Sequence, residues 1–326
     1  MQYQQRLHMA GARLLQWCLL TCCSLENAAK DPQQINDLLI LYLQHLYDRG
    51  KAFWWGPHSI LYVQTRWRSL KGHLRQAWDS VSTWKMEQPV RSRVPFRYEL
   101  VQAVSYAAVL HAVALDCGKA ALWWSLAVVL RLGFFGLLRP KEICQMRIGH
   151  VVTPGPGVFR SLSCVVLSII EPKNRMAMGR LQVRLVRDLP AVLWTSWFVK
   201  NQDEHNLLWP FGPAVLRTSI QQLLKYLNLH NLGLCPSGLR TGGATALLEQ
   251  GTSIASIRFA GGWASDRNLA YYLQEAESAQ TMLKIVPSVA RRLERFLCAF
   301  DFLDAPPSFP FSSAGPSWSL TTCRDS

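Results

Sequence analysis

The sequence of 326 residues lacks the residue spacings that mark metal sites and disulfide frameworks. Its nine cysteines are odd in number, include no Cys-x-x-Cys pair and are accompanied by no His-x-His pair. A scattered set of this kind argues against a structural zinc site and against a secreted, disulfide-bonded domain. We therefore expect reduced thiols in an intracellular protein that uses no metal and no other cofactor.

Long apolar runs free of charge are also missing. Residues 120–138 are nearly long enough to cross a bilayer, but Arg131 lies inside this run and Gly133 and Gly136 interrupt its second half. Residues 14–23 vaguely resemble the core of a signal peptide but lack a small-residue cleavage site. We expect a buried core helix at 120–138, no targeting segment and no membrane partner. A helical membrane protein is the alternative, which solubility without detergent would exclude.

Acidic residues are scarce relative to basic ones. The chain has 21 Asp and Glu against 35 Lys and Arg, a formal net charge of +14. An excess of this size suggests a polyanionic partner, usually a nucleic acid and sometimes an anionic membrane. The hydrophobic content of 49% with 17% charged residues is typical of a globular protein. A chain of this length can bury two moderate cores, and we expect two domains.

The first predicted domain, residues 35–88, is a helical module with a basic surface, while residues 1–34 receive no role. One apolar helix face is formed by Ile35, Leu38, Leu39, Tyr42, Leu43 and Leu46. Gly50 stands where this helix ends. From residue 49 to 97 the acids Asp79 and Glu87 are outnumbered by ten Lys or Arg, at 49, 51, 66, 68, 71, 75, 85, 91, 93 and 97.

A basic surface interleaved with tryptophan suits contacts to DNA phosphates. In this module and the linker after it we expect such contacts from Arg66, Arg68, Lys71, Arg75, Arg91 and Arg93. The alternative for each residue is a solvated basic face over a tryptophan-rich core.

The second predicted domain, residues 97–300, follows an extended linker at 89–96, where prolines disfavour helix. Nearly continuous apolar sequence from 98 to 138 indicates buried helix. A new helix begins at Pro140, with Glu142 in its first turn. Later helices are expected at 190–199, at 213–227 and, as one last helix that includes Pro287, at about 279–300. The Pro/Ser-rich tail, 301–326, is predicted to be disordered.

Between these helices the sequence predicts strands. Residues 151–152 and 164–170 are apolar, and a half-buried strand follows in which Leu181, Val183 and Leu185 alternate with Gln182 and Arg184. Lys173 lies at the hairpin between the last two strands. The fold class is therefore mainly α with a small antiparallel β-sheet.

The stretch from Pro236 to Gln274 combines residues suited to phosphate chemistry. Arg240 lies in a helix-opening signal, Trp263 follows it by 23 residues (263 − 240) and Tyr272 follows Trp263 by 9 (272 − 263). Metal-free cleavage of a phosphodiester needs a nucleophile, cations on the non-bridging oxygens and an acid for the leaving oxygen. Tyrosine, arginine and lysine can supply these three functions.

The second domain resembles the catalytic domain of the tyrosine recombinase (phage integrase) superfamily, and most closely its divergent branch in eukaryotic mobile elements. The resemblance covers about residues 97–285, and the helical module before it occupies the place of the family's core-binding domain. GLLRPKEICQM resembles the first arginine box, with an acid three positions after the arginine. By this resemblance the family's site residues correspond to Arg139, Glu142, Lys173, Ser237, Arg240, Trp263 and Tyr272.

The sequence departs from the family pattern at Ser237, where the family has a histidine that acts as an acid or base. A serine hydroxyl still donates a hydrogen bond, but it does not titrate near neutral pH. Trp263 would act by packing and through one N–H donor, with a purely structural role as its alternative. Arg175 competes with Lys173. Tyr271 competes with Tyr272, because adjacent helical side chains point about 100° apart.

The resemblance implies a site-specific DNA recombinase or integrase that cuts and rejoins DNA through a covalent 3′-phosphotyrosine intermediate. In it Tyr272 attacks the scissile phosphate and Lys173 protonates the leaving 5′ oxygen. The oxygens are held by Arg139 and Arg240, with Trp263 and Ser237 in support, and Glu142 orients Arg139.

The resemblance also implies double-stranded DNA as partner, a homotetramer on DNA, and an intracellular, DNA-associated location that is nuclear if the source is eukaryotic. One alternative is a catalytically impaired mobile-element remnant that only binds DNA. The other is strand passage of the type IB topoisomerase kind.

Overall fold

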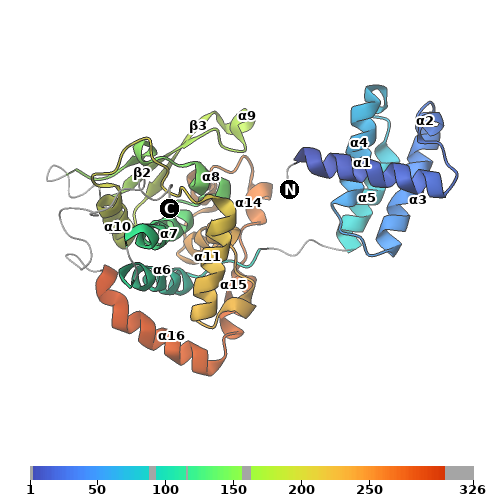
Figure 1. Ribbon diagram of the computed structural model, residues 1–326. Helices are drawn as coiled ribbons and strands as arrows, with labels where there is room; N and C mark the ends of the chain where they lie inside the picture. Colours follow the sequence, from blue (N-terminus) through green and yellow to red (C-terminus); the bar gives the residue numbers. More distant parts are fainter. Residues whose placement is uncertain (1–2, 88–92, 115–116, 156–162, 305–326) are drawn as a thin grey trace. The chain divides into compact units, whose positions relative to one another are not determined.

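The chain forms two compact units, Met1–Arg91 and Ser92–Ser326. In the computed structural model (Figure 1), the described residues are 3–87, 93–114, 117–155 and 163–304. Both units are mainly helical, and the second contains one three-stranded antiparallel sheet, so the predicted fold class is confirmed. The predicted tail beyond residue 304 and the first half of the predicted linker, Arg91 included, lie outside the described residues.

The first unit is a bundle of helices around one apolar core. Its elements are α1 (Tyr3–Leu20), α2 (Leu25–Ala28), α3 (Pro32–Asp48), α4 (Trp55–Arg66), a 3₁₀ turn (Arg68–Leu70) and α5 (Arg75–Glu87). The side chain of Asp31 caps α3, Pro32 is at its start, and the whole predicted apolar face is buried. Gly50 follows with φ +58°, as predicted for a helix end.

Residues 1–34, for which the sequence pattern indicates no role, complete this core. α1 packs against α4, and its Leu14 and Cys18 are buried in the same cluster as α3 and α5. Burial raises the pKa of the Cys18 thiol to about 11, and the described cysteines are free thiols. Cys18 therefore behaves as a small apolar side chain.

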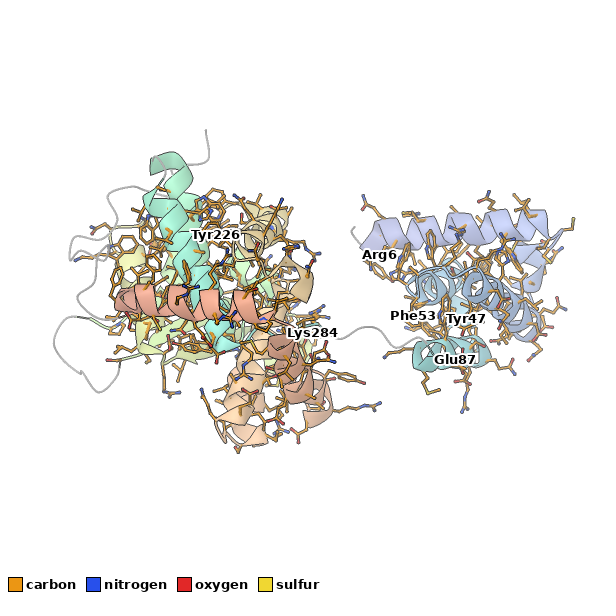
Figure 2. The ribbon with its side chains drawn as sticks, turned by 90° about the horizontal axis from the view of Figure 1, so that it is seen from below. Arg6, Tyr47, Phe53, Glu87, Tyr226 and Lys284 are labelled. Carbon is orange, nitrogen blue, oxygen red and sulfur yellow. The ribbon has the colours of Figure 1, made fainter. Side chains whose placement is uncertain are left out.

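The second unit is built around two buried helices, α6 (Tyr98–Val113) and α7 (Cys117–Phe135), which pack on each other. Around them lie α8 (Pro140–Gln145), α9 (Arg175–Met178), α10 (Leu189–Val199), α11 (Gly212–Tyr226), α12 (Ser237–Glu249), α13 (Ile254–Gly261), α14 (Asp266–Ala270), α15 (Glu275–Leu283) and α16 (Pro287–Phe300). Figure 2 draws the side chains as sticks and labels Tyr226, the last residue of α11, and Lys284, the C-cap of α15. The start of α8 at Pro140, with Glu142 in its first turn, is as predicted.

Arg131, which interrupts the apolar run of α7, is a core residue with charged partners. It is 1% exposed, its guanidinium lies 2.7 Å from Asp304 and 3.9 Å from Asp188, and it covers the Trp194 ring at 4.2 Å. A buried arginine of this kind requires such partners. Across the described residues, we find no helix with the length and apolarity needed to cross a membrane.

The sheet has the order β1–β2–β3, formed by β1 (Val151–Val152), β2 (Val165–Ile170) and β3 (Leu181–Val186). Both pairs are antiparallel, with Val165 opposite Val186 and Ile170 opposite Leu181. The burial of β3 is the reverse of ordinary amphipathic alternation. Gln182 and Arg184 are only 7% and 4% exposed, whereas the apolar residues that alternate with them, Leu181, Val183 and Leu185, are 61%, 51% and 45% exposed.

The prediction of one last helix over 279–300 is wrong. The segment forms α15 and α16, separated at Lys284–Val286, and Val286 has an extended conformation (ψ 137°). The cause is Pro287, which restricts the residue before it to extended conformations and occupies the first position of α16.

Candidate active site

Arg240, on the first turns of α12, is the centre of the site. It is 1% exposed, and its guanidinium donates hydrogen bonds to the carbonyl oxygens of Leu137 and Gly261, the latter at 2.8 Å. Leu137 follows the end of α7 with φ +51°, a conformation uncommon for a bulky residue, which presents its carbonyl to the arginine. Arg240 therefore connects the ends of α7 and α13.

Trp263 and Tyr272 pack against this arginine. The Arg240 guanidinium lies 4.0 Å from the Trp263 ring centre and 5.5 Å from the Tyr272 ring centre. The two rings contact each other edge to face, 5.1 Å apart, within a small cluster that includes Leu137 and Leu269. Tyr271, the C-cap of α14, is 65% exposed and belongs to no such cluster. The structure thus brings Tyr272, and not Tyr271, to Arg240.

Two buried donors of this cluster remain unused. Arg240 Nε and Trp263 Nε1 have no hydrogen-bond partner among the described residues, and both atoms are inaccessible to water. A buried N–H without an acceptor costs about 1–3 kcal/mol. Arginine has five N–H donors in a planar fork, and the two carbonyl groups use only part of them. An oxyanion that accepts from these donors would remove the cost.

Arg139 is the N-cap residue of α8, and Glu142 lies in the first turn of the same helix. Glu142 accepts hydrogen bonds from the Arg139 backbone N–H at 2.8 Å and from its guanidinium at 2.5 Å. The carboxylate therefore caps the helix and orients the arginine at the same time. Burial lowers the pKa of Arg240, Arg139 lowers it further and Glu142 opposes the shift, as expected for charges near the buried guanidinium.

Arg184, which the sequence did not single out, adds a third cation, and its side chain is buried. Burial lowers its pKa to about 10, Glu142 opposes the shift and Arg139 adds to it. Burial also lowers the pKa of Arg240 to about 9, with Arg139 and Arg184 contributing in the same direction and Glu142 and Tyr272 opposing. Both guanidinium groups remain charged at pH 7. The site thus has an excess of positive charge suited to an anion.

The remaining predicted residues lie at the margin of this cluster. Lys173 is exposed in the β2–β3 connection, directly before Asn174, whose side chain donates to the Gly262 carbonyl at 2.6 Å. Arg175, its competitor, begins α9 and is also exposed. Ser237 is at the start of α12, with its hydroxyl 3.1 Å from the Cys235 sulfur.

Sequence reasoning missed two polar groups that hold the site together. Thr245, on α12, places its hydroxyl 3.2 Å from the Tyr272 carbonyl and accepts from the Gln274 N–H at 3.1 Å, so it fixes the segment that bears the nucleophile candidate. Arg184 reaches the Gly261 carbonyl at 3.0 Å from β3. No local sequence pattern signals either contact, because both depend on tertiary structure.

In the first unit the predicted phosphate-contacting residues are exposed, and they differ in their partners. Arg66 pairs with Glu26 at 2.9 Å and lies 5.0 Å from the Trp67 ring centre. Arg75 lies 3.9 Å from Asp79, and Arg68 and Lys71 are exposed beside the 3₁₀ turn. Arg93, in the second unit, is exposed as well.

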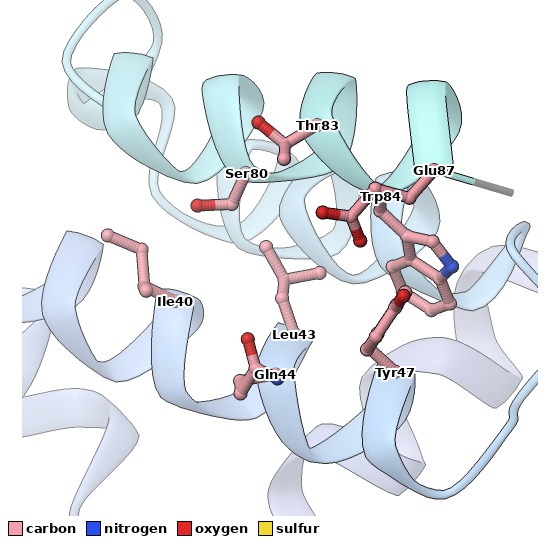
Figure 3. A pocket seen from close by; sticks show the side chains of 8 residues that line it. All are labelled: Ile40, Leu43, Gln44, Tyr47, Ser80, Thr83, Trp84 and Glu87. Carbon is pink, nitrogen blue, oxygen red and sulfur yellow. The ribbon is translucent and has the colours of Figure 1, made fainter.

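A cavity of about 460 Å³ lies between α3 and α5 of the first unit (Figure 3). It is lined by Ile40, Leu43, Gln44, Tyr47, Ser80, Thr83, Trp84 and Glu87. Tyr47 and Glu87, labelled in Figures 2 and 3, come from the ends of the two helices, and a hydrogen bond to Glu87 raises the pKa of Tyr47. None of the predicted site residues lines this cavity.

No protein-family model and no curated protein matches the chain. Among solved structures, XerH site-specific recombinase bound to a difH substrate in a pre-cleavage complex is 13% identical, with a TM-score of 0.45 over 77% of this chain and 70% of that chain. XerA recombinase is 14% identical, with a TM-score of 0.42 over 90% and 98% of the two chains. XerH bound to a palindromic difH substrate in a post-cleavage complex is 12% identical, with a TM-score of 0.45 over 78% and 73%.

Proposed function

We propose that this chain breaks and rejoins DNA strands through a covalent bond between Tyr272 and a 3′ phosphate, as a site-specific tyrosine recombinase does. The observation behind the proposal is the buried Arg240, which contacts both Trp263 and Tyr272 while its Nε and the Trp263 Nε1 have no acceptor among the described residues. A non-bridging phosphate oxygen is an acceptor of the right charge for both donors.

In the proposed reaction the phenolic oxygen of Tyr272 attacks phosphorus, and the phenol proton passes to water. The new O–P bond forms as the bond to the 5′ oxygen breaks, and Lys173 donates a proton to that oxygen. Arg139 and Arg240 hold the non-bridging oxygens, Glu142 fixes Arg139, and Ser237 adds a donor at the start of α12. The phosphotyrosine retains the energy of the original ester, so that a 5′ hydroxyl can reverse the reaction.

Binding of the duplex is assigned to both units. Arg68, Lys71 and Arg75 present exposed cations on the first unit, and Arg93 does so at the beginning of the second. Contacts of this kind bind the phosphate backbone without reading its sequence. Recombination between two duplexes further requires several copies of the chain, and we propose a tetramer on DNA.

A second candidate is a protein that binds DNA without cutting it. The specific observation in its favour is Ser237, whose hydroxyl faces the Cys235 sulfur and which replaces the titratable histidine of the resembled family. Without a group that titrates near neutral pH at this position, proton transfer during the attack depends on other residues. Strand passage by a monomer, of the type IB topoisomerase kind, uses the same attack and differs by relaxing supercoiled DNA.

A covalent-trapping assay separates these candidates. The protein is incubated with a pool of random-sequence duplexes, each nicked just beyond a potential cleavage site so that the leaving fragment diffuses away. We expect an adduct that survives denaturation and contains the peptide with Tyr272. Tyr272→Phe should abolish it, and Tyr271→Phe, at the exposed neighbour, should retain it. DNA binding with no adduct from the unaltered protein would favour the second candidate.

A further inference from the structure

The inward-facing polar residues of β3 belong to a chain of hydrogen bonds. Arg184 donates to the Gln182 Oε1 at 2.7 Å, the Gln182 Nε2 donates to the Asn174 Oδ1 at 3.1 Å, and the Asn174 Nδ2 donates to the Gly262 carbonyl at 2.6 Å. Arg184 also donates to the Gly261 carbonyl at 3.0 Å. The chain therefore begins and ends on the turn that contains Trp263.

Burying these polar groups is costly. Their presence therefore suggests a task that apolar residues could not perform. An apolar β3 face would be buried at no polar desolvation cost, whereas here Leu181, Val183 and Leu185 are exposed instead. The hydrogen bonds offset the desolvation of Gln182 and of most of Arg184, although the Arg184 Nε is left without a partner among the described residues. The inverted strand is consistent with a role in the adjacent site.

The two glycines before Trp263 show how closely this contact is packed. A Cβ at Gly262 would overlap an Arg184 nitrogen and would lie 2.6 Å from the Gln182 Oε1. A Cβ at Gly261 would overlap the Trp263 ring. Gly262 also has φ +62°, where a side chain is strained. Because neither glycine has a side chain, Arg184 and Gln182 can pack against Gly262, and the Trp263 indole can pack against Gly261.

We propose that Asn174, Gln182 and Arg184 form a positioning network that holds the β2–β3 connection against the Gly261–Trp263 turn and so places Lys173 for proton donation to the leaving 5′ oxygen. Lys173 directly precedes Asn174, so the anchor nearest to the acid is one residue away. Gly261 also accepts from Arg240 at 2.8 Å. The Gly261 carbonyl therefore binds both Arg184 of the hairpin and Arg240, so the position of one constrains the position of the other.

This inference rests on the proposed function, and its test uses two substrates. In the ordinary substrate, breaking the P–O bond requires a proton on the 5′ oxygen. In a substrate with sulfur at the 5′ bridging position, the thiolate leaves without a proton, so a displaced acid does not slow the reaction. Both probes are nicked duplexes of one sequence recovered from the random pool.

Asn174→Ala is the main variant because it removes the anchor beside Lys173 while leaving buried Arg184 in place. Gln182→Ala is a second variant, which interrupts the chain on β3, and Met176→Ala, at a side chain 96% exposed on the same connection, is the matched control. A positioned general acid contributes about 10²–10⁴-fold to rate. We expect Asn174→Ala to slow cleavage of the ordinary substrate at least tenfold and cleavage of the sulfur substrate less than twofold.

Equal slowing of both substrates would overturn the positioning of Lys173, because a general disturbance of Arg240 or Trp263 affects both. Cleavage of both substrates by Asn174→Ala at the unaltered rate would also overturn the positioning of Lys173. Hydrogen exchange of the peptides covering 171–180 and 258–266 provides a readout that needs no cleavage. Asn174→Ala should increase exchange in both segments and Met176→Ala in neither, and an increase confined to 171–180 would refute the network.

The absence of a Tyr272-dependent adduct with either substrate from the unaltered protein would overturn the proposed function and the acid role together. The exchange experiment would still decide whether the network holds the turn.

Discussion

The guanidinium carbon of Arg240 lies 4.0 Å from the centre of the Trp263 ring, so one face of the cation is covered by an indole. A cation over a desolvated aromatic ring gains about 2 kcal/mol or more, which helps to offset the burial of this charge. The indole covers a face of the guanidinium, while the N–H bonds point outward in its plane. We therefore expect an anion to bind at the edge of Arg240, where its unpartnered Nε lies.

Anion binding at Arg240 should stabilise the fold. Sulfate at tenfold excess over its Kd raises the free energy of unfolding by about 1.4 kcal/mol, and the midpoint of thermal unfolding rises with it. Arg240→Lys, which loses the fork, should abolish this rise at matched ionic strength. Arg258→Lys, at a half-exposed residue paired with Asp266, is the control and should retain it. An equal rise in Arg240→Lys would place the anion elsewhere.

Trp263→Phe should separate packing from hydrogen bonding. The smaller ring still covers Arg240, and the buried, unpartnered Nε1–H is removed, which recovers about 1–3 kcal/mol against the loss of packing. We expect the free energy of unfolding to fall by less than about 2 kcal/mol in chemical denaturation. Cleavage in the trapping assay should fall by about 10- to 100-fold, the value of one hydrogen bond to a charged group. An unchanged rate would restrict Trp263 to a packing role.

Two glycines with left-handed backbone provide a matched pair. Gly251 has φ +80° with nothing within 4 Å of an added Cβ, while Gly262 has φ +62° and would meet Arg184 and Gln182. Gly251→Ala should cost only the backbone strain, about 1–2 kcal/mol. Gly262→Ala should cost at least about 2 kcal/mol more, because side chains of the hairpin must move. Equal losses in urea unfolding would mean that β3 does not press on the turn.

Cations of the first unit should contribute to affinity through counterion release. Removal of one cation that neutralises a phosphate lowers the slope of log K against log salt by about 0.9. Arg68→Ala and Lys71→Ala should each reduce the slope by about this amount and weaken binding to all sequences alike. Lys30→Ala, outside the basic stretch and bonded to Asn27, removes the same charge and should leave the slope unchanged. Fluorescence anisotropy over a series of salt concentrations measures the slope.

Ser237→His should introduce a titration that the unaltered protein lacks. An imidazole at this position has an ordinary pKa of about 6.5, so cleavage by the variant should change through an inflection between about pH 6 and 7. The unaltered protein should show no inflection from this position, because a serine hydroxyl does not titrate there. The test is to measure single-turnover trapping rates of both proteins across this pH range. Identical pH profiles would show that the side chain at position 237 takes no part in the reaction.

Local patterns in the sequence were sufficient for much of the fold. The apolar face from Ile35 to Leu46, the glycine that follows it and the proline at the start of α8 each follow from the residues themselves. The strands and the hairpin position of Lys173 were also predicted. One local rule was overlooked, since the restriction before Pro287 already separates α15 from α16.

The orientation of β3 could not be predicted from its alternation. A period of two residues shows that a strand has two faces but not which one is buried. Here the buried face is decided by the Gly261 carbonyl, 77 residues after Arg184. Arg240, Trp263 and Tyr272 were singled out by their spacing and Arg139 by the resemblance of its surroundings to an arginine box. The supporting contacts of Arg184 and Thr245 depend on tertiary structure alone.

The Gly261 carbonyl, which accepts from both Arg184 and Arg240, belongs to the last residue of α13. The C-terminal end of a helix has a partial negative charge, so α13 directs the negative end of its dipole at two cations. Adding or removing one residue in this helix would turn its last carbonyl by about 100° and separate it from both. The length of α13 from its Ser253 cap to Gly261 therefore sets the direction of this carbonyl, and an insertion within the helix is expected to disrupt both contacts.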